Sequence, residues 1–271
     1  MSEISATNAV SATDGRIVTE KRGRIFIIKL ERPKKLNGFS VRMIEELAAA
    51  YTMFEQDAEA WVGLLCAEGP HFTAGLQLDQ IGPFMARGES LWPDGAIDPF
   101  GLRDPKRTKP MVAAVQGITF TIGIELMLAT DVVVAAHDCR FSQLEVKRGI
   151  MATGGATIRM AERAGWGNAM RYLLTGDEFD AATALRFGFV QEVVPAGQQF
   201  GRALQIAERI AAQAPLAVRA TIASTRTMVE HGQDAAVAEF RMVQARLANS
   251  MDAKEGVASF VDKRDARFTG N

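Results

Sequence analysis

Two glutamates occupy positions where a carboxylate could act as an acid or a base. Glu125 lies in the apolar run 123–129, which predicts a helix between two strands and therefore a carboxylate away from water. Burial raises the pKa of a carboxyl group toward the neutral range that general acid or base catalysis uses. The alternative is a buried structural glutamate bonded to backbone groups, and the run alone is compatible with both.

Glu145 stands twenty positions later, after a strand-like stretch and before Gly149. Taken alone, it is interpreted as a solvated charge beside Lys147 and Arg148. However, each glutamate follows its own strand in successive β/α units, so both side chains could point into one cleft at the same sheet edge. Two carboxylates in one cleft could hold a water molecule between them and work as an acid and base pair.

Backbone donors for an oxyanion are expected beside these carboxylates. Small residues at 73–75 would let a ligand approach the backbone closely and leave the N–H of Leu76 free to donate. An ordinary loop is the alternative for this segment. A second donor is expected near Ile122, because N–H groups in the first turn of a helix lack intrahelical partners.

The elements that must position these groups alternate between strand and helix. Residues 81–109 lack a regular pattern and predict a functional or mobile loop, and 117–121 predict a short connection. The alternation implies an α/β fold with parallel strands. Strands are predicted at 25–30, 61–67, 111–116, 131–136 and 189–194, and helices at 44–51 (capped by Ser40), 123–129 and 181–187 (capped by Asp180).

The chain changes character after about Gln199, where strand signals end. Three or four amphipathic helices are predicted from there to the C-terminus, one of them started by the capping-box pattern of Asp252 and Glu255. The expected organisation is a flexible tip at 1–14, a β/α core at 15–198 that holds the site, and a helical region at 199–271.

Composition and missing motifs exclude several classes of protein. The 31 basic and 32 acidic residues give a net charge of -1, which creates no field to gather nucleic acid or an anionic membrane. No apolar run approaches the roughly 20 residues of a membrane span, and no targeting segment precedes Arg16, so we expect a cytoplasmic protein. Cys66 and Cys139 are expected to be buried thiols rather than a disulfide. Dinucleotide, phosphate-loop and nucleophile-elbow motifs are absent, and the histidines lack ligand spacing, so no metal site is expected.

Several motifs in sequence order resemble the landmarks of crotonases, the enoyl-CoA hydratase and isomerase superfamily. The resemblance runs from about Arg16 to Phe268. The motifs that carry it are Arg32-Pro33 to Leu36-Asn37, 72–76, Lys109-Pro110 to Gln116-Gly117, 123–126 with Asp131, 141–145, 174–176, 184–188, and Glu255-Gly256 to Phe260 with Lys263-Arg264.

The resemblance implies a crotonase-like spiral of repeated ββα units, a C-terminal helical region for oligomerisation, and homotrimers or dimers of trimers. It implies an acyl-CoA thioester as substrate, with coenzyme A entering as part of that substrate and no other cofactor. The family's oxyanion N–H groups correspond to Leu76 and Ile122, and its hydratase glutamates to Glu125 and Glu145. Substrate or coenzyme A contacts are implied at Leu36, Asn37, Gly38, Thr73, Ala74 and Gly75, and at Phe260 and Lys263 of a neighbouring subunit.

The predicted activity is hydration of a trans-2-enoyl-CoA to a 3-hydroxyacyl-CoA, a lyase reaction. Isomerisation of a double bond or thioester hydrolysis, where one carboxylate suffices, is the alternative within enzymes. A catalytically silent acyl-CoA or RNA-binding member is the alternative from another class. The chain also departs from the family: Thr121-Ile122-Gly123 replaces a glycine triplet, Leu144 and Ala152 replace prolines, and Thr153 stands where glycine is common, so substrate and reaction can differ from a typical short-chain hydratase.

Overall fold

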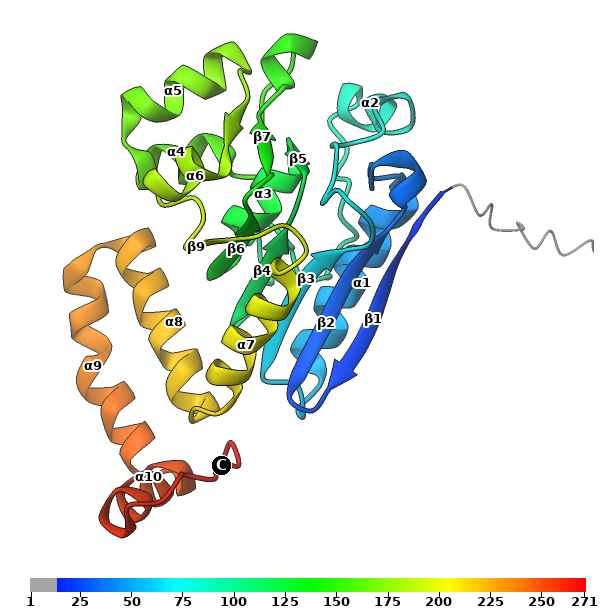
Figure 1. Cartoon of the computed structure of the whole chain (residues 1–271). Coiled ribbons are helices and arrows are strands. Elements are labelled where there is room, and N and C mark those ends of the chain that lie inside the picture. The colour runs from blue at the N-terminus through cyan, green and yellow to red at the C-terminus, as the bar shows by residue number, and fades with distance from the viewer. Residues whose placement is uncertain (1–13) are drawn as a thin grey trace, which may run out of the picture.

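The strands form two sheets, of which the larger organises the core (Figure 1). The computed structural model describes residues 14–271, so all but the last residue of the expected N-terminal tip lies outside the described residues. The larger sheet has the order β1-β2-β3-β4-β6-β9, parallel except for the β1–β2 pair. Its strands are β1 (Arg16–Arg22), β2 (Ile25–Glu31), β3 (Val62–Ala67), β4 (Met111–Val115), β6 (Val132–Ala136) and β9 (Glu192–Val194); the smaller sheet holds β5 (Ile118–Phe120), β7 (Arg140–Ser142) and β8 (Phe179–Asp180).

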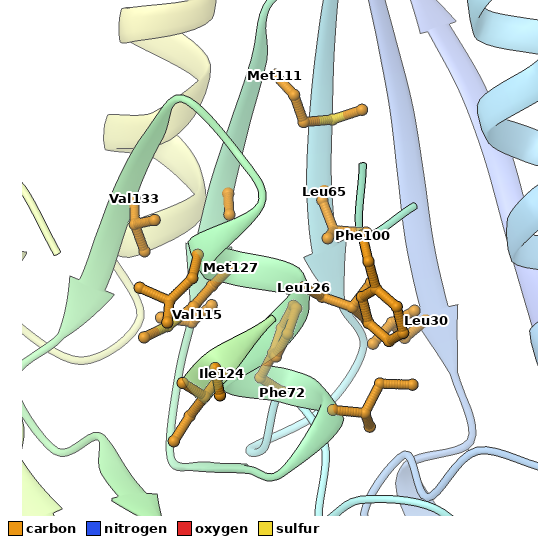
Figure 2. Packing of buried hydrophobic residues seen from close by; sticks show 14 of the residues in the cluster. Leu30, Leu65, Phe72, Phe100, Met111, Val115, Ile124, Leu126, Met127 and Val133 are labelled. Atoms are coloured by element: carbon orange, nitrogen blue, oxygen red, sulfur yellow. The ribbon is translucent and has the colours of Figure 1, made fainter. Parts of the chain in front are cut away.

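Alternation along the strands buries both faces of the larger sheet. Phe26 and Ile28 of β2 join a cluster that includes α1 (Val41–Gln56) and α3 (Ile122–Leu128), whereas Ile27 faces α7 (Gln199–Ala211). This is the period of two expected for a strand covered on both sides. All seven residues of α3 are buried, and Figure 2 shows Ile124, Leu126 and Met127 projecting from it into the cluster.

Most of the predicted elements are confirmed, and local hydrogen bonds explain why they were predictable. Ser40 Oγ accepts the N–H of Met43 at 3.3 Å at the start of α1, and Asp180 Oδ1 accepts the N–H of Thr183 at 2.8 Å at the start of α6 (Ala181–Arg186). Each cap satisfies an N–H that the first helical turn leaves without a partner. The strand predicted at 189–194 is only partly confirmed, because the observed strand, β9, spans Glu192–Val194.

Three local predictions are wrong. Helix α2 (Leu78–Ala86) begins before the segment expected to be irregular and extends into it, and β5 occupies the expected connection at 117–121. The capping-box prediction fails because Ser250, not Asp252, caps α10 (Met251–Asp262), with its Oγ accepting from Ala253 N at 3.0 Å. The buried Asp252 carboxylate instead accepts the N–H groups of Thr269 and Gly270 and ties the C-terminal residues to this helix.

The remaining helices surround the sheets. After β9 the described chain is helical, and α8 to α10 extend away from the sheets in Figure 1. No helix within residues 14–271 combines the length and apolar character needed to cross a membrane. Cys66 and Cys139 are buried free thiols, as predicted. The other elements are η1 (Pro33–Lys35), η2 (Glu145–Arg148), α4 (Ala156–Ala164), α5 (Trp166–Thr175), α8 (Pro215–His231) and α9 (Gln233–Ala248).

An ion pair between the buried Arg107 and Asp131, whose side chain is one-third exposed, joins the end of the 87–110 segment to the sheet. The Arg107 guanidinium donates to both carboxylate oxygens of Asp131 at 2.8 and 3.0 Å, and to the carbonyl oxygens of Lys109 and Ala129. Asp131 also accepts the N–H of Met111 at 2.7 Å. A guanidinium buried this deeply is stable only while these acceptors remain.

Replacing Asp131 with alanine should therefore lower the free energy of unfolding by about 2 kcal/mol, because the buried Arg107 would lose a charged acceptor, although solvent screens the one-third-exposed carboxylate. Urea denaturation measures the change. Glu178→Ala is the matched control, since Glu178 pairs with an exposed Arg140 and its loss should cost about 1 kcal/mol or less. Equal losses in the two variants would contradict a structural role for the Arg107–Asp131 pair.

Candidate active site

Two cavities meet at Leu76. The larger, about 520 Å³, is lined by Leu76, Ile122 and Glu125 together with residues of α1, α2 and the 88–103 segment. The smaller, about 190 Å³, is lined by Leu76 and Glu145 together with residues 74–75, Thr121 and the 144–150 segment. Each predicted carboxylate therefore lines its own cavity, whereas one cleft was predicted for both, and Leu76, one of the two predicted N–H donors, lines both cavities.

Glu125 is anchored through one carboxylate oxygen. Its side chain comes from α3 and the residue is only 5% exposed. Oε1 accepts the N–H of Gly154 at 2.6 Å and of Ala156 at 3.4 Å, whereas Oε2 accepts no hydrogen bond within the described chain. A Cβ on Gly154 would lie 2.5 Å from Oε2, so only glycine allows this approach.

Burial sets the protonation behaviour of Glu125. Removal from water raises the pKa of this carboxyl group, while the N–H bonds from Ala156 and Gly154 and the positive charge of Arg159 act against that rise. The two alternatives for Glu125 are thus compatible: it is bonded to backbone like a structural glutamate, yet one oxygen remains for chemistry in the larger cavity.

Glu145 is not the solvated charge that its basic neighbours suggest. It begins η2 and is partly buried, and burial raises the pKa of Glu145 to about 7, with the Glu125 charge as a further cause. The two carboxylates are thus close enough for one to disfavour ionisation of the other. Lys147 and Arg148 are exposed, and although Arg148 lines the smaller cavity, no ion pair joins either to Glu145 in the described chain.

The buried Gln143 side chain contacts both carboxylate oxygens of Glu145. With its amide oriented so that each end faces a suitable partner, Nε2 donates to Glu145 Oε1 at 3.0 Å and to Oε2 at 2.8 Å. A neutral donor at this distance favours the ionised carboxylate and opposes the effect of burial. Sequence reasoning missed this residue, because nothing in the order of residue types indicates which way a buried amide points.

The two predicted backbone donors line the larger cavity with their N–H groups unused. Leu76 pairs with Phe39 in an isolated parallel bridge, in which Phe39 N donates to Gly75 O and Gln77 N to Phe39 O. The N–H of Leu76 takes no part in this bridge, and it donates to no acceptor within residues 14–271. Ile122 opens α3 and its N–H likewise lacks an acceptor in that range.

Comparison with known proteins decides the family. The model of the enoyl-CoA hydratase/isomerase family matches residues 20–271. The chain belongs to this family. Its members act on acyl-CoA thioesters, and the crotonase resemblance predicted from sequence is confirmed together with its fold.

Relatives with assigned names cover nearly the whole chain. An enoyl-CoA hydratase named EchA19 from Mycobacterium tuberculosis is 31% identical over 93% of this chain and 95% of its own length. The 2,3-dehydroadipyl-CoA hydratase of Escherichia coli is 29% identical over 94% and 98%. A crystal structure of a probable enoyl-CoA hydratase/isomerase from Mycobacterium abscessus, 44% identical, superposes with a TM-score of 0.91 over 94% and 98% of the chains.

Four of the positions where this chain departs from the family pattern line the two cavities, whereas Ala152 is buried and lines neither. The branched side chain of Ile122 is buried and forms part of the larger cavity, as does Thr153 beside Glu125. Thr121 adopts a left-handed φ of 49° and lines the smaller cavity with Leu144. The departures therefore change the shape and polarity of the walls beside the two glutamates.

The residues predicted to contact coenzyme A lie in two regions of the chain, six of them between Leu36 and Gly75 and two at the end of α10. Gly38, Ala74 and Gly75 line a third cavity of about 330 Å³, next to Leu76 and with Lys35 at its edge. The side chains of Asn37 and Thr73 are buried in hydrogen bonds to the backbone, and Leu36 is partly exposed. Phe260 and Lys263 lie at the end of α10, far from α2 and α3 in Figure 1, so their predicted contacts require another subunit.

Replacing Gln143 with leucine should raise the pKa of Glu145, because the ionised carboxylate would lose its two amide hydrogen bonds while remaining partly buried. The expected rise is roughly one to two pH units, from the strength of hydrogen bonds to charged groups. Titration of the labelled side-chain carboxyl carbon by NMR measures it directly. Gln116→Leu, which removes a buried amide that donates to Ala67 O and Gly69 O, is the control; an unchanged Glu145 titration in Gln143→Leu would refute the interaction.

Proposed function

We propose that this protein adds water to a trans-2-enoyl-CoA to give a 3-hydroxyacyl-CoA. The observation that carries the proposal is that two carboxyl groups of raised pKa, Glu125 and Glu145, influence each other's ionisation and line cavities that share Leu76 as a wall residue. Hydration is the family reaction that uses both an acid and a base, because it transfers one proton from water and delivers another to carbon.

The thioester carbonyl oxygen would accept the N–H groups of Leu76 and Ile122. Negative charge develops on this oxygen as the double bond is attacked, and donors already held in place stabilise it without reorganising. Their availability supports the assignment, since neither N–H is used within the described residues. Each donor is expected to stabilise the transition state by roughly 3 kcal/mol.

The two carboxyl groups would divide the proton transfers. Ionised Glu125 accepts a proton from water through its unanchored Oε2 while the water oxygen bonds to C3 of the substrate. Protonated Glu145 donates its proton to C2, so that both ends of the double bond are satisfied. Exchange with solvent then returns Glu125 to its ionised form and Glu145 to its protonated form.

Coenzyme A would enter as part of the substrate, and no further cofactor is needed for these steps. The third cavity beside Leu76, with the cationic Lys35 at its edge, is suited to hold the pantetheine and phosphate portion. Phe260 and Lys263 would reach it from a neighbouring subunit of a homotrimer or dimer of trimers. In support of assembly, α8 to α10 expose many apolar side chains: Met228, Val229, Val237, Phe240, Met242, Val257, Phe260 and Val261.

Glu125→Gln and Glu145→Gln should each lower kcat for hydration by about 10²- to 10⁴-fold, because each removes one proton transfer while conserving shape. Loss of the conjugated thioester absorbance of crotonyl-CoA and longer 2-enoyl-CoAs measures the rate. Glu239→Gln, an exposed carboxylate on α9, is the control and should retain full activity.

The activities of the wild-type protein and of the two glutamine variants distinguish hydration from the alternative reactions. A wild-type protein that consumes no 2-enoyl-CoA of any length would remove the proposed function. If only one glutamate matters, a reaction that needs a single carboxylate, such as double-bond isomerisation, is favoured instead.

The pH dependence of kcat/KM should be bell-shaped, since hydration requires Glu145 protonated and Glu125 ionised. As pH rises through about 7, Glu145 loses its proton and the rate falls. As pH falls, Glu125 becomes protonated above the ordinary carboxyl range because burial raises its pKa, and the rate falls again. Measurement from pH 5 to 9 tests this; an alkaline limb that persists in Glu145→Gln would assign it to another group.

A further inference from the structure

We propose that the acyl group taken by the larger cavity is extended and apolar, and that it ends in a carboxylate that binds Arg103. The inference rests on the proposed function, because it concerns the substrate of the same site. It is carried by the size of the cavity and by how charge is distributed on its walls.

The deep part of the cavity is apolar and large. Ile44, Trp92, Phe100 and Ile122 are buried and line it beside Glu125. Trp92 and Phe100 meet edge to face with ring centroids 5.1 Å apart, which makes a rigid aromatic corner. A volume of about 520 Å³ falls in the range that holds drug-sized ligands, so a four-carbon acyl chain would leave much of it unfilled.

The rim of the same cavity is exposed and polar. Gly88, Glu89, Ser90 and Arg103 line it and are exposed to solvent. An acyl chain that starts at the buried Glu125 and fills the apolar part would therefore bring its far end to these polar groups. A bare methyl terminus gains little there, whereas a polar terminus keeps its hydration and gains a partner.

Among the rim charges, Arg103 is the group with donors to offer. Its Nη1 donates to Ser90 Oγ at 3.2 Å and its Nε lies 3.6 Å from Asp98 Oδ2, but Nη2 has no acceptor in the described part of the chain. Glu89 would repel an anion, yet it is neutralised by two hydrogen bonds from Arg87 at 2.6 and 2.7 Å. A planar guanidinium with free N–H groups suits a carboxylate, which can accept two of them.

The Arg103 position is fixed by backbone rather than by its own side chain. The buried Asp98 carboxylate accepts the N–H groups of Phe100, Leu102 and Arg103 at 2.9 to 3.0 Å. Asp98 thus holds the wall segment in shape, and a change of the Arg103 side chain leaves these bonds in place. Arg103→Gln also removes the 3.6 Å ion pair with Asp98, so an unchanged preference for ten carbons over four is the sign that the wall is intact in this variant.

The experiment compares three saturated acyl-CoAs by calorimetric binding: butyryl-CoA, decanoyl-CoA and a ten-carbon acyl-CoA with a terminal carboxylate. The corresponding 2-enoyl-CoAs are compared by kcat/KM. Decanoyl-CoA should bind about tenfold or more tightly than butyryl-CoA, since each buried methylene favours binding. The terminal carboxylate should add about two- to fivefold, a size limited by solvent at the half-exposed Arg103.

Arg103→Gln should abolish the preference for the carboxylate and leave the preference for ten carbons over four unchanged. Arg171→Gln is the control, an exposed arginine on α5 that lines none of these cavities, and it should keep both preferences. Two results would overturn the inference. One is equal affinity for decanoyl-CoA and for the ten-carbon acyl-CoA that ends in a carboxylate, and the other is a preference for the carboxylate that persists in Arg103→Gln. Binding in the expected order without turnover would uphold it and reject the proposed hydration, so the two failures are distinguishable.

Discussion

A carboxylate buried in the first turn of a short helix is the constraint on which the rest of the site depends. Glu125 can remain there because Gly154 and Ala156, from a segment almost thirty residues later, present backbone N–H groups to one of its oxygens. The same two bonds therefore stabilise a charge and join α3 to the start of α4. Only Oε1 of Glu125 accepts these bonds, so this oxygen stabilises the fold while Oε2 stays available for the reaction.

The second carboxyl group is controlled by opposite influences. Burial and the nearby Glu125 favour the protonated form of Glu145, while the Gln143 amide favours the ionised form. A group balanced in this way changes protonation near neutral pH, where a small change in surroundings is enough to move its proton. The backbone donors at Leu76 and Ile122 are independent of this balance, since an N–H group does not titrate in this range.

The features that could be predicted from sequence are those fixed within a few residues. The caps at Ser40 and Asp180 and the apolar runs of the strands act locally. Local patterns and the family motifs both indicated Leu76, Ile122, Glu125 and Glu145, which line the two cavities, and their catalytic roles stay predictions. The features that were missed depend on distant partners. The Glu125 anchor comes from another element, the contacts of Asp252 run to the C-terminus, and α2 forms although Gly82 and Pro83 disfavour a helix, because Ile81 is buried against the core.

The backbone of the cavity wall is held by the buried Asp98, whereas the side chains of Phe100, Leu102 and Arg103 line the cavity. Shape and chemistry of this wall are thus encoded by separate residues. A lineage of such enzymes can exchange the lining residues one at a time and acquire new acyl preferences without refolding the segment. Asp98 shares this task with Arg159, which donates to the carbonyl oxygen of Phe100 at 2.6 Å, so the wall has more than one attachment and tolerates change in its lining.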